Sequence, residues 1–345
     1  MSGKKTDTRG NLILCFALLI GALVDLCAYQ AQDGNLEAVE MILNQDYSGA
    51  TRLLKQRLYS DPEDIEAMYL GLIVEQTRIL DYESYVVEGD WFIDLAESVR
   101  NQIEPRVALL NGSDSLRGVF YLANIVGGIG MIQAKNGNWL EGARSAYSSV
   151  ALLKNILKTD PEFVAAKLGI GLFDYYLGSS LSWIPFVGSR IERGVKMIQE
   201  ATVAPLPYNV AAINSLCWIY MEQEKYAIVD SLAAMVLERY PDNSIYLKIR
   251  ALAALRSGQY DKAVPVALSL IEQSKSRDPV NWSDHLTGYY ILVKSYERTG
   301  NGVLAFATSE EILSIAIPED SKTIPHIDRH LHYLTQVRDR FRETK

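Results

Sequence analysis

Cysteine is scarce in this chain, with only three among 345 residues. Cys15 and Cys27 lie near the N-terminus, in a segment with the features of an export signal, so Cys217 is the only cysteine in the rest of the chain. One cysteine cannot form an intramolecular disulfide framework, and the stability of the fold must therefore come from elsewhere. We interpret Cys217 as a small buried helix residue.

The chain also lacks an excess of basic residues. It has 34 Lys and Arg against 42 Asp and Glu, which gives a formal net charge of −8. Binding to nucleic acid depends on clustered Lys and Arg, so this charge argues against a nucleic-acid partner. Hydrophobic residues make up 48% of the sequence, enough for a substantial core.

Motifs for catalysis and metal binding are lacking as well. His326 and His330 would share a helix face near His332, but no HExxH glutamate accompanies them, and we expect them on a solvated helix. The segment 127–130 is rich in glycine, but it lies within a helical pattern and follows no predicted strand, which indicates close helix packing and not a phosphate site. His285 has no nucleophile signature around it. We therefore expect no enzyme activity, no metal and no cofactor.

The first 31 residues are typical of a signal peptide. Three basic residues precede a 13-residue apolar run, Leu12–Val24, which is shorter than the roughly 20 residues of a membrane-spanning helix. We predict cleavage after Ala28 or Ala31; retention of the segment as a membrane anchor is the alternative. Residues 32–345 would then form the mature domain, which we expect in the bacterial periplasm or tethered to the periplasmic side of the cell envelope.

A spacing of 34 residues determines the predicted fold. Tyr226 and Ala233 recur as Tyr260 and Ala267, each 34 residues later. This spacing is typical of repeats that consist of two antiparallel helices. The segment 238–243 contains a proline and then polar residues, as expected where one repeat ends and the next begins.

Other repeats can be recognised with more distortion. Asp46–Ala50 and Asn138–Ala143 both match the turn before a second helix, and the helix that follows the latter is expected to be long. The tail Pro325–Arg342 has the spacing of an amphipathic helix that would cap the open end of the stack. We predict an all-α fold, an α-solenoid of six to seven antiparallel helix pairs with a C-terminal capping helix.

The stretch 161–201 has an unusual middle. It predicts two helices, the first beginning with Pro161, and Gly169 and Gly171 would let a neighbouring helix approach closely. The connecting segment 178–189 is apolar and irregular, so it must cover something. Either it packs internally, or it contacts a partner or a membrane surface. Its large side chains are those of Leu181, Trp183, Pro185 and Phe186.

Four segments carry a resemblance to a known family: Trp91 with Asp94–Ala96, Gly137–Trp139, Lys167–Tyr176 (KLGIGLFDYY) and Trp183–Gly188 (WIPFVG). With them, the chain resembles the tetratricopeptide-repeat (TPR) superfamily throughout residues 32–345. More narrowly, it is similar to exported bacterial TPR proteins with long middle helices, although Ser189 stands where that pattern usually has an aspartate. Such proteins are mostly without an assigned reaction, so the resemblance implies a scaffold and names no ligand.

Two function classes remain open. The first is a non-catalytic scaffold whose concave groove, lined by the first helix of each repeat, binds a peptide or a partner protein. The second is a small-molecule or lipid-binding module with the 178–189 insertion as a lid. The repeat register places six residues in the concave groove: Asn214, Trp218, Lys248, Leu252, Tyr290 and Lys294.

Overall fold

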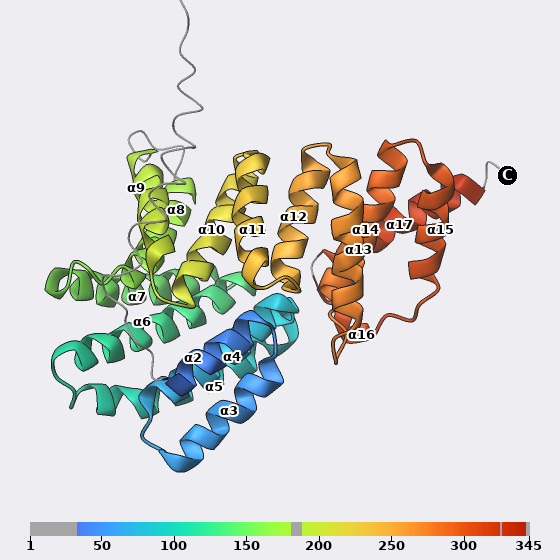
Figure 1. Cartoon of the computed structure of the whole chain (residues 1–345). Helices are drawn as coiled ribbons and strands as arrows, with labels where there is room; N and C mark the ends of the chain where they lie inside the picture. Colours follow the sequence, from blue (N-terminus) through green and yellow to red (C-terminus); the bar gives the residue numbers. More distant parts are fainter. Residues whose placement is uncertain (1–32, 181–187, 325, 343–345) are drawn as a thin grey trace, which may run out of the picture.

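Helices form nearly the whole structure. The computed structural model describes residues 33–180, 188–324 and 326–342, and within these ranges there are sixteen α-helices, one short 3₁₀ helix and no strand (Figure 1). The predicted signal peptide and the side chains at 181–187 lie outside the described residues. The expected all-α class is confirmed.

Fourteen of the helices form seven consecutive pairs; in six of them a short turn joins the two helices, and in the other the connection at 181–187 lies outside the described residues. The pairs are α2 (Asp33–Leu43) with α3 (Tyr47–Ser60), α4 (Ile65–Asp81) with α5 (Tyr85–Val107), α6 (Gly112–Lys135) with α7 (Trp139–Thr159), α8 (Ala165–Ser180) with α9 (Gly188–Glu200), α10 (Tyr208–Glu222) with α11 (Tyr226–Arg239), α12 (Ser244–Arg256) with α13 (Tyr260–Lys275), and α14 (Trp282–Arg298) with α15 (Gly302–Leu313). A 3₁₀ turn, Ala201–Val203, precedes α10. Seven pairs agree with the predicted six to seven.

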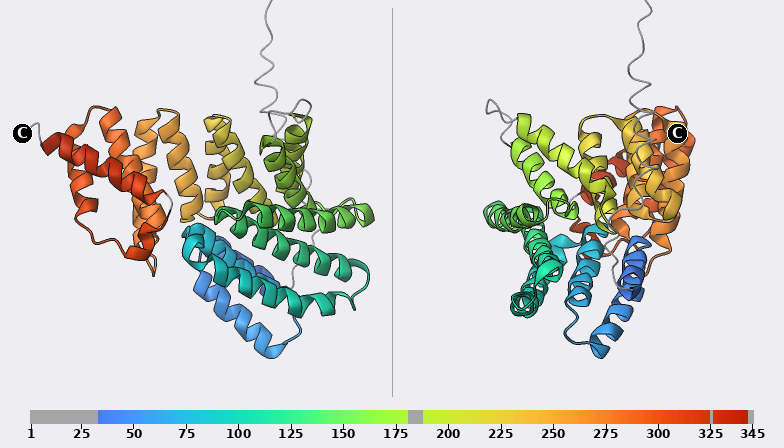
Figure 2. Two further views of the ribbon diagram at one scale, coloured as in Figure 1. Left: turned by 180° about the vertical axis from the view of Figure 1, so that it is seen from behind. Right: turned by 60° about the vertical axis from the view of Figure 1, so that its left-hand side comes forward.

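The pairs stack side by side into a solenoid. Each first helix contacts the first helix of the next pair, from α2 through α14, and each also contacts its own partner. The helices α8–α15 stand roughly upright in Figure 1, whereas α6 and α7 run across the picture. Figure 2 shows that this change of direction brings the N-terminal helices beneath the ends of the later ones. The stack therefore curls back toward itself.

The 34-residue register holds in the structure. The helices α11 and α13 begin at Tyr226 and Tyr260, and Ala233 and Ala267 are fully buried, while both tyrosines are half-buried. Asn243 caps α12 by accepting hydrogen bonds from two amides of its first turn. The long middle helices are confirmed, since α5, α6 and α7 have 23, 24 and 21 residues.

Glycines allow two close helix crossings. A Cβ on Gly130 of α6 would lie 2.9 Å from the carbonyl oxygen of Gly142 in α7, and one on Gly171 of α8 would lie 2.7 Å from that of Gly194 in α9. No other residue fits such contacts without a backbone shift. The expected close packing at 127–130 and at Gly171 is confirmed.

Two details concern helix ends and length. Pro161 lies in a turn and α8 begins only at Ala165, so the predicted start of this helix is wrong; the backbone of Phe163 and Val164 instead bonds to the preceding turn. Among the described residues, α6 is long and apolar enough to cross a membrane, but α5 and α7 pack on it within the solenoid.

The C-terminal helix closes the stack as expected. After the short α16 (Glu319–Lys322), α17 (Ile327–Arg342) packs on α14 and α15 and buries Ile327, Leu334 and Val337. This apolar stripe covers the end that a further repeat would otherwise occupy.

Candidate functional site

The six residues predicted for the concave groove lie on neighbouring first helices. Asn214 and Trp218 are on α10, Lys248 and Leu252 on α12, and Tyr290 and Lys294 on α14. All are half-buried except Lys248, which is only 7% exposed. The structure therefore places them along one row of helices, but it does not leave all six open to a partner.

Lys248 is bound by carboxylates of its own chain. Its Nζ lies 2.7 Å from Oδ1 of Asp284 on α14 and 3.4 Å from Oε1 of Glu83 in the α4–α5 turn. The other oxygen of Glu83 lies 3.1 Å from Nδ1 of His326, just before α17. Burial alone would raise the pKa of Glu83, but Lys248 and His326 hold it well below its usual range. This lysine therefore joins three distant parts of the chain.

A second set of polar contacts continues this arrangement. The carboxylate of Asp81, at the end of α4, accepts hydrogen bonds from Tyr47 at 2.8 Å, Gln45 at 2.8 Å and Arg277 at 3.1 Å. Gln45 also donates to the hydroxyl of Ser244, at 3.2 Å. Burial, together with the nearby Asp284, raises the pKa of Asp81 to about 6.

We call these contacts the junction. It joins the α2–α3 and α4–α5 turns to α12, the α13–α14 turn, α14 and the start of α17, across about 200 residues of sequence. The members of the junction are Gln45, Tyr47, Asp81, Glu83, Ser244, Lys248, Arg277, Asn281, Asp284 and His326. Within the junction Lys248 binds carboxylates, but they belong to this chain and not to a partner.

The capping helix covers another part of the predicted groove. The ring of Tyr290 stacks on that of His330, with centroids 4.3 Å apart, and Lys294 donates a 2.6 Å hydrogen bond to the hydroxyl of Tyr290. Burial, with His326 and Arg329 nearby, lowers the pKa of His330 to about 3. The expected solvated position is therefore wrong for His326 and His330, because α14 packs against them. Partner binding at the six predicted groove residues stays a prediction, and Lys248, Tyr290 and Lys294 already have partners within the chain.

The insertion can be described only at its base. Asp174 of α8 is almost fully buried and binds Arg190 and Arg193 of α9, at 2.9 Å and 2.8 Å. These ion pairs hold the two helices together on either side of the connection. Leu181, Trp183, Pro185 and Phe186 lie outside the described residues, so internal packing, partner contact and the lid all stay predictions.

The remaining histidine has a structural environment. His285 is buried, with Nδ1 3.0 Å from the hydroxyl of Ser274, and burial lowers its pKa. The same hydroxyl bonds to the carbonyl of Ile271. Among the described residues no three His, Cys, Asp or Glu side chains cluster as metal ligands would.

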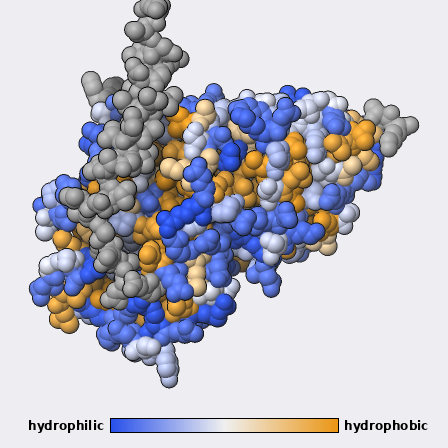
Figure 3. Space-filling model, viewed as in Figure 1, coloured by the Kyte–Doolittle hydropathy of each residue, from blue (hydrophilic) through white to orange (hydrophobic). Residues whose placement is uncertain are grey.

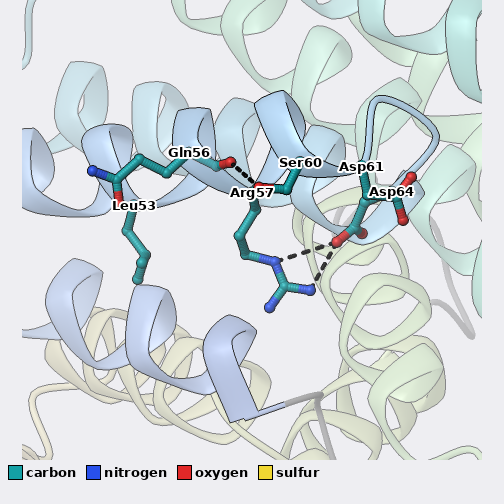
Figure 4. A pocket seen from close by; sticks show the side chains of 6 residues that line it. All are labelled: Leu53, Gln56, Arg57, Ser60, Asp61 and Asp64. Atoms are coloured by element: carbon teal, nitrogen blue, oxygen red, sulfur yellow. Dashed lines mark hydrogen bonds and ion pairs between the residues drawn. The ribbon is translucent and has the colours of Figure 1, made fainter.

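On the described part of the chain, grooves formed by helices of the N-terminal half lie outside the junction, and two of them differ in size. The smaller, about 360 Å³, is lined by α3 and the α3–α4 turn, where Arg57 reaches Asp64 at 2.8 Å (Figure 4). This ion pair satisfies the main charges of the groove internally.

On the face seen in Figure 3, hydrophobic patches are divided by hydrophilic side chains.

The larger groove lies between α5 and α7, with α6 as its floor, and we call it the α5–α7 groove. Its volume is about 550 Å³. Leu122, Val126 and Ile129 form an apolar floor, and Tyr147 on the α7 wall is 69% exposed. Sequence reasoning missed this site, because the helices around it are off the 34-residue period. The feature of the sequence that could have indicated this groove is the unusual length of the helical patterns that form α5, α6 and α7. Its lining residues are Glu97, Arg100, Glu104, Leu122, Val126, Ile129, Arg144, Ser145, Tyr147, Ser148, Ala151, Leu152 and Asn155.

Comparison with known proteins adds little beyond the fold. No family model matches the chain. No curated protein matches it either. Among solved structures, the chain is similar to the C-terminal part of a TPR repeat-containing protein from Cytophaga hutchinsonii, with 15% identity, over 84% of this chain and 99% of that one. The TM-score is 0.38, so this likeness supports no argument about function. The TPR-like character rests on this chain's own helix pairs and their 34-residue spacing.

Proposed function

We propose that the protein is a non-catalytic scaffold of the bacterial cell envelope that holds a segment of a partner protein in the α5–α7 groove. A stack of helix pairs presents extended surfaces, and proteins of this architecture typically use them for binding. The observation that carries the proposal is the groove itself. It combines an apolar floor with an exposed aromatic wall residue, as binding sites for proteins do.

The α7 wall supports this choice of surface. Trp139 and Leu140 are 71% and 60% exposed at the start of α7, and Leu140 lies one heptad before Tyr147, on the same side of the helix. Large exposed apolar side chains beside a groove are characteristic of contact surfaces. The concave groove is a weaker choice, because the junction and the capping helix engage Lys248, Tyr290 and Lys294.

The envelope location rests on the predicted signal peptide alone. The apolar run at 12–24 and the basic residues before it support export.

A photo-crosslinking amino acid at Tyr147, introduced into the full chain in the native cell, tests the proposal. We expect one dominant crosslinked protein from the envelope fraction. The control position is Tyr59 on α3, which is 91% exposed but away from the groove. A crosslink pattern that is the same at Tyr147 and Tyr59 would reject the α5–α7 groove as the binding site.

A further inference from the structure

Resting on the proposed function, we infer that the occupant of the α5–α7 groove is an amphipathic helix of a partner protein. Its apolar stripe would face α6, with basic residues on the flank toward α5 and acidic residues on the flank toward α7. Three features support this: the floor, the charges of the two walls and the lack of a strand edge.

The floor is a single stripe of apolar side chains. Leu122, Val126 and Ile129 are spaced by four and three residues, so they lie on one face of α6, and each lines the groove. Leu122 and Val126 are half-buried, which leaves part of each available to a ligand. Such a stripe matches the i, i+3, i+4 spacing of apolar residues on a docked helix.

The α5 wall is acidic. Asp90, Glu97 and Glu104 are seven residues apart and share one side of α5, where Glu97 and Glu104 line the groove. Arg100 lies 3.3 Å from Glu97 and 3.8 Å from Glu104, so one cation is shared by two carboxylates. A negative charge therefore remains along this wall and favours basic residues on the facing flank of the ligand.

The α7 wall is basic. Arg144 lines the groove, Lys158 lies two heptads later on the same side, and Lys154 is exposed one turn before it. Lys154 and Lys158 lie outside the groove lining, and the acidic residues near the three cations are Glu141, 4.0 Å from Arg144, and Asp160 at the C-cap, which leaves a net positive charge on this side of α7. The two walls thus carry opposite charges, and a ligand with complementary flanks would bind in one orientation only.

A helix fits this groove better than an extended strand. The described residues around the groove are all helical, so their backbone groups already bond within α5, α6 and α7 and offer no sheet edge. A ligand helix satisfies its own backbone groups as well. The stretch of α7 that lines the groove, 144–155, is about 16 Å long, which corresponds to about three helical turns.

Binding of stapled helical peptides to the full chain, measured by fluorescence anisotropy, tests the inference. The basic-flank peptide has an apolar stripe with lysines on one flank and glutamates on the other; the control peptide has the same stripe with serines on both flanks, so that neither peptide carries a net charge on its flanks. We expect the basic-flank peptide to bind about tenfold more tightly, the combined effect of several exposed ion pairs. A variant with Glu97→Lys and Glu104→Lys, which gives both walls basic residues, should abolish that preference.

Substitution in the floor provides the second arm. Val126→Asp should weaken binding of the basic-flank peptide about thirtyfold, as expected for a central apolar contact. The control Val303→Asp places the same charge at an 80% exposed position on α15 and should bind as the original chain does. Because Val126→Asp can also disturb folding, Tyr147→Ala is measured beside it; this exposed residue should weaken binding without lowering the melting temperature.

Several results would overturn the inference. Equal binding of both peptides, or binding unaffected by Val126→Asp and Tyr147→Ala, would reject an oriented helix in this groove. Self-association of the chain that Val126→Asp abolishes would identify a second copy as the occupant. If neither peptide binds while the Tyr147 crosslink persists, the partner class is wrong and the proposed scaffold function stands. If the Tyr147 crosslink fails, the α5–α7 groove is not the binding site, and both the proposed function at this groove and the inference are wrong.

Discussion

Single residues in the turns between paired helices show where this repeat stack is specialised. Six of these turns contain a residue with positive φ, a conformation that favours glycine. In three of the turns this residue is not a glycine. Gln45 and Glu83 belong to the junction, where their side chains contact distant helices, and Glu224 is exposed. The residues are Gly137, Gly258 and Gly300 on the one hand, and Gln45, Glu83 and Glu224 on the other.

Substitution of Glu224 and of Glu83 by glycine should therefore change the stability of the fold in opposite directions. Glu224→Gly relieves a strained backbone at an exposed position and should raise the free energy of unfolding by about 0.5–1 kcal/mol. Glu83→Gly relieves the same strain but removes the contacts to Lys248 and His326. It should therefore lower the free energy of unfolding by about 2 kcal/mol. Urea unfolding of both variants measures the difference. Stabilisation by Glu83→Gly would mean that the contacts of Glu83 to Lys248 and His326 contribute less to stability than the backbone strain costs.

At the scale of elements, the capping helix depends on a neutral histidine. His330 stacks on Tyr290, and the groups facing it are His326 and Arg329 beside it in sequence, Glu83 from the α4–α5 turn and Lys294 from α14. Burial lowers its pKa to about 3, against 6.5 for an exposed histidine. The unfolded chain therefore takes up a proton at this residue before the folded chain does, so stability decreases as pH falls below about 6.5.

Acid should consequently loosen α17 first. Between pH 7 and pH 5 His330 should cost the folded state about 1–2 kcal/mol. His330→Phe retains a ring to stack on Tyr290 but cannot take up a proton, so its melting temperature should fall less over the same range. The comparison requires thermal unfolding of both proteins at the two pH values. An equal fall would show that other groups cause the acid sensitivity.

The elements themselves were largely predictable from the sequence. Tyr226 and Tyr260 gave the period, and the apolar stripe of 327–337 gave the cap, because both patterns are local. The start of α8 was missed, since Pro161 fits either a first helical turn or the turn before it. The α5–α7 groove was missed because Leu122 and Val126 carry the ordinary spacing of core residues. Their partial exposure depends on how far apart α5 and α7 lie.

For the whole molecule, the junction turns an open stack into one that closes on itself. Its buried charges lie in helix pairs that are far apart in sequence, so no local pattern could have predicted it. The repeat register did place Lys248 on the inner row of helices. The register could not predict the contact between Glu83 and Lys248, because the curvature of a solenoid accumulates over many small rotations between repeats.

Removal of the central cation should open this closed form. Lys248→Met leaves Glu83 and Asp284 without their shared partner and should lower the free energy of unfolding by about 3–5 kcal/mol. The control Lys294→Met, which loses one hydrogen bond to Tyr290, should cost about 1 kcal/mol. Small-angle scattering should show a larger radius of gyration for Lys248→Met alone. An unchanged radius together with unchanged stability would contradict a closing role for the junction.

The junction also fixes the order in which the chain can become native as it is made. Most solenoids can mature one repeat at a time from the N-terminus, because each repeat needs only its neighbours. Here Asp81 cannot form its hydrogen bonds to Arg277 and Asn281 until those residues, about 200 positions later in the sequence, have been synthesised. At ~5–20 residues per second, that interval is on the order of 10–40 s. For that time the first two repeats stay incompletely paired, which keeps the chain receptive to chaperones or to a translocation channel.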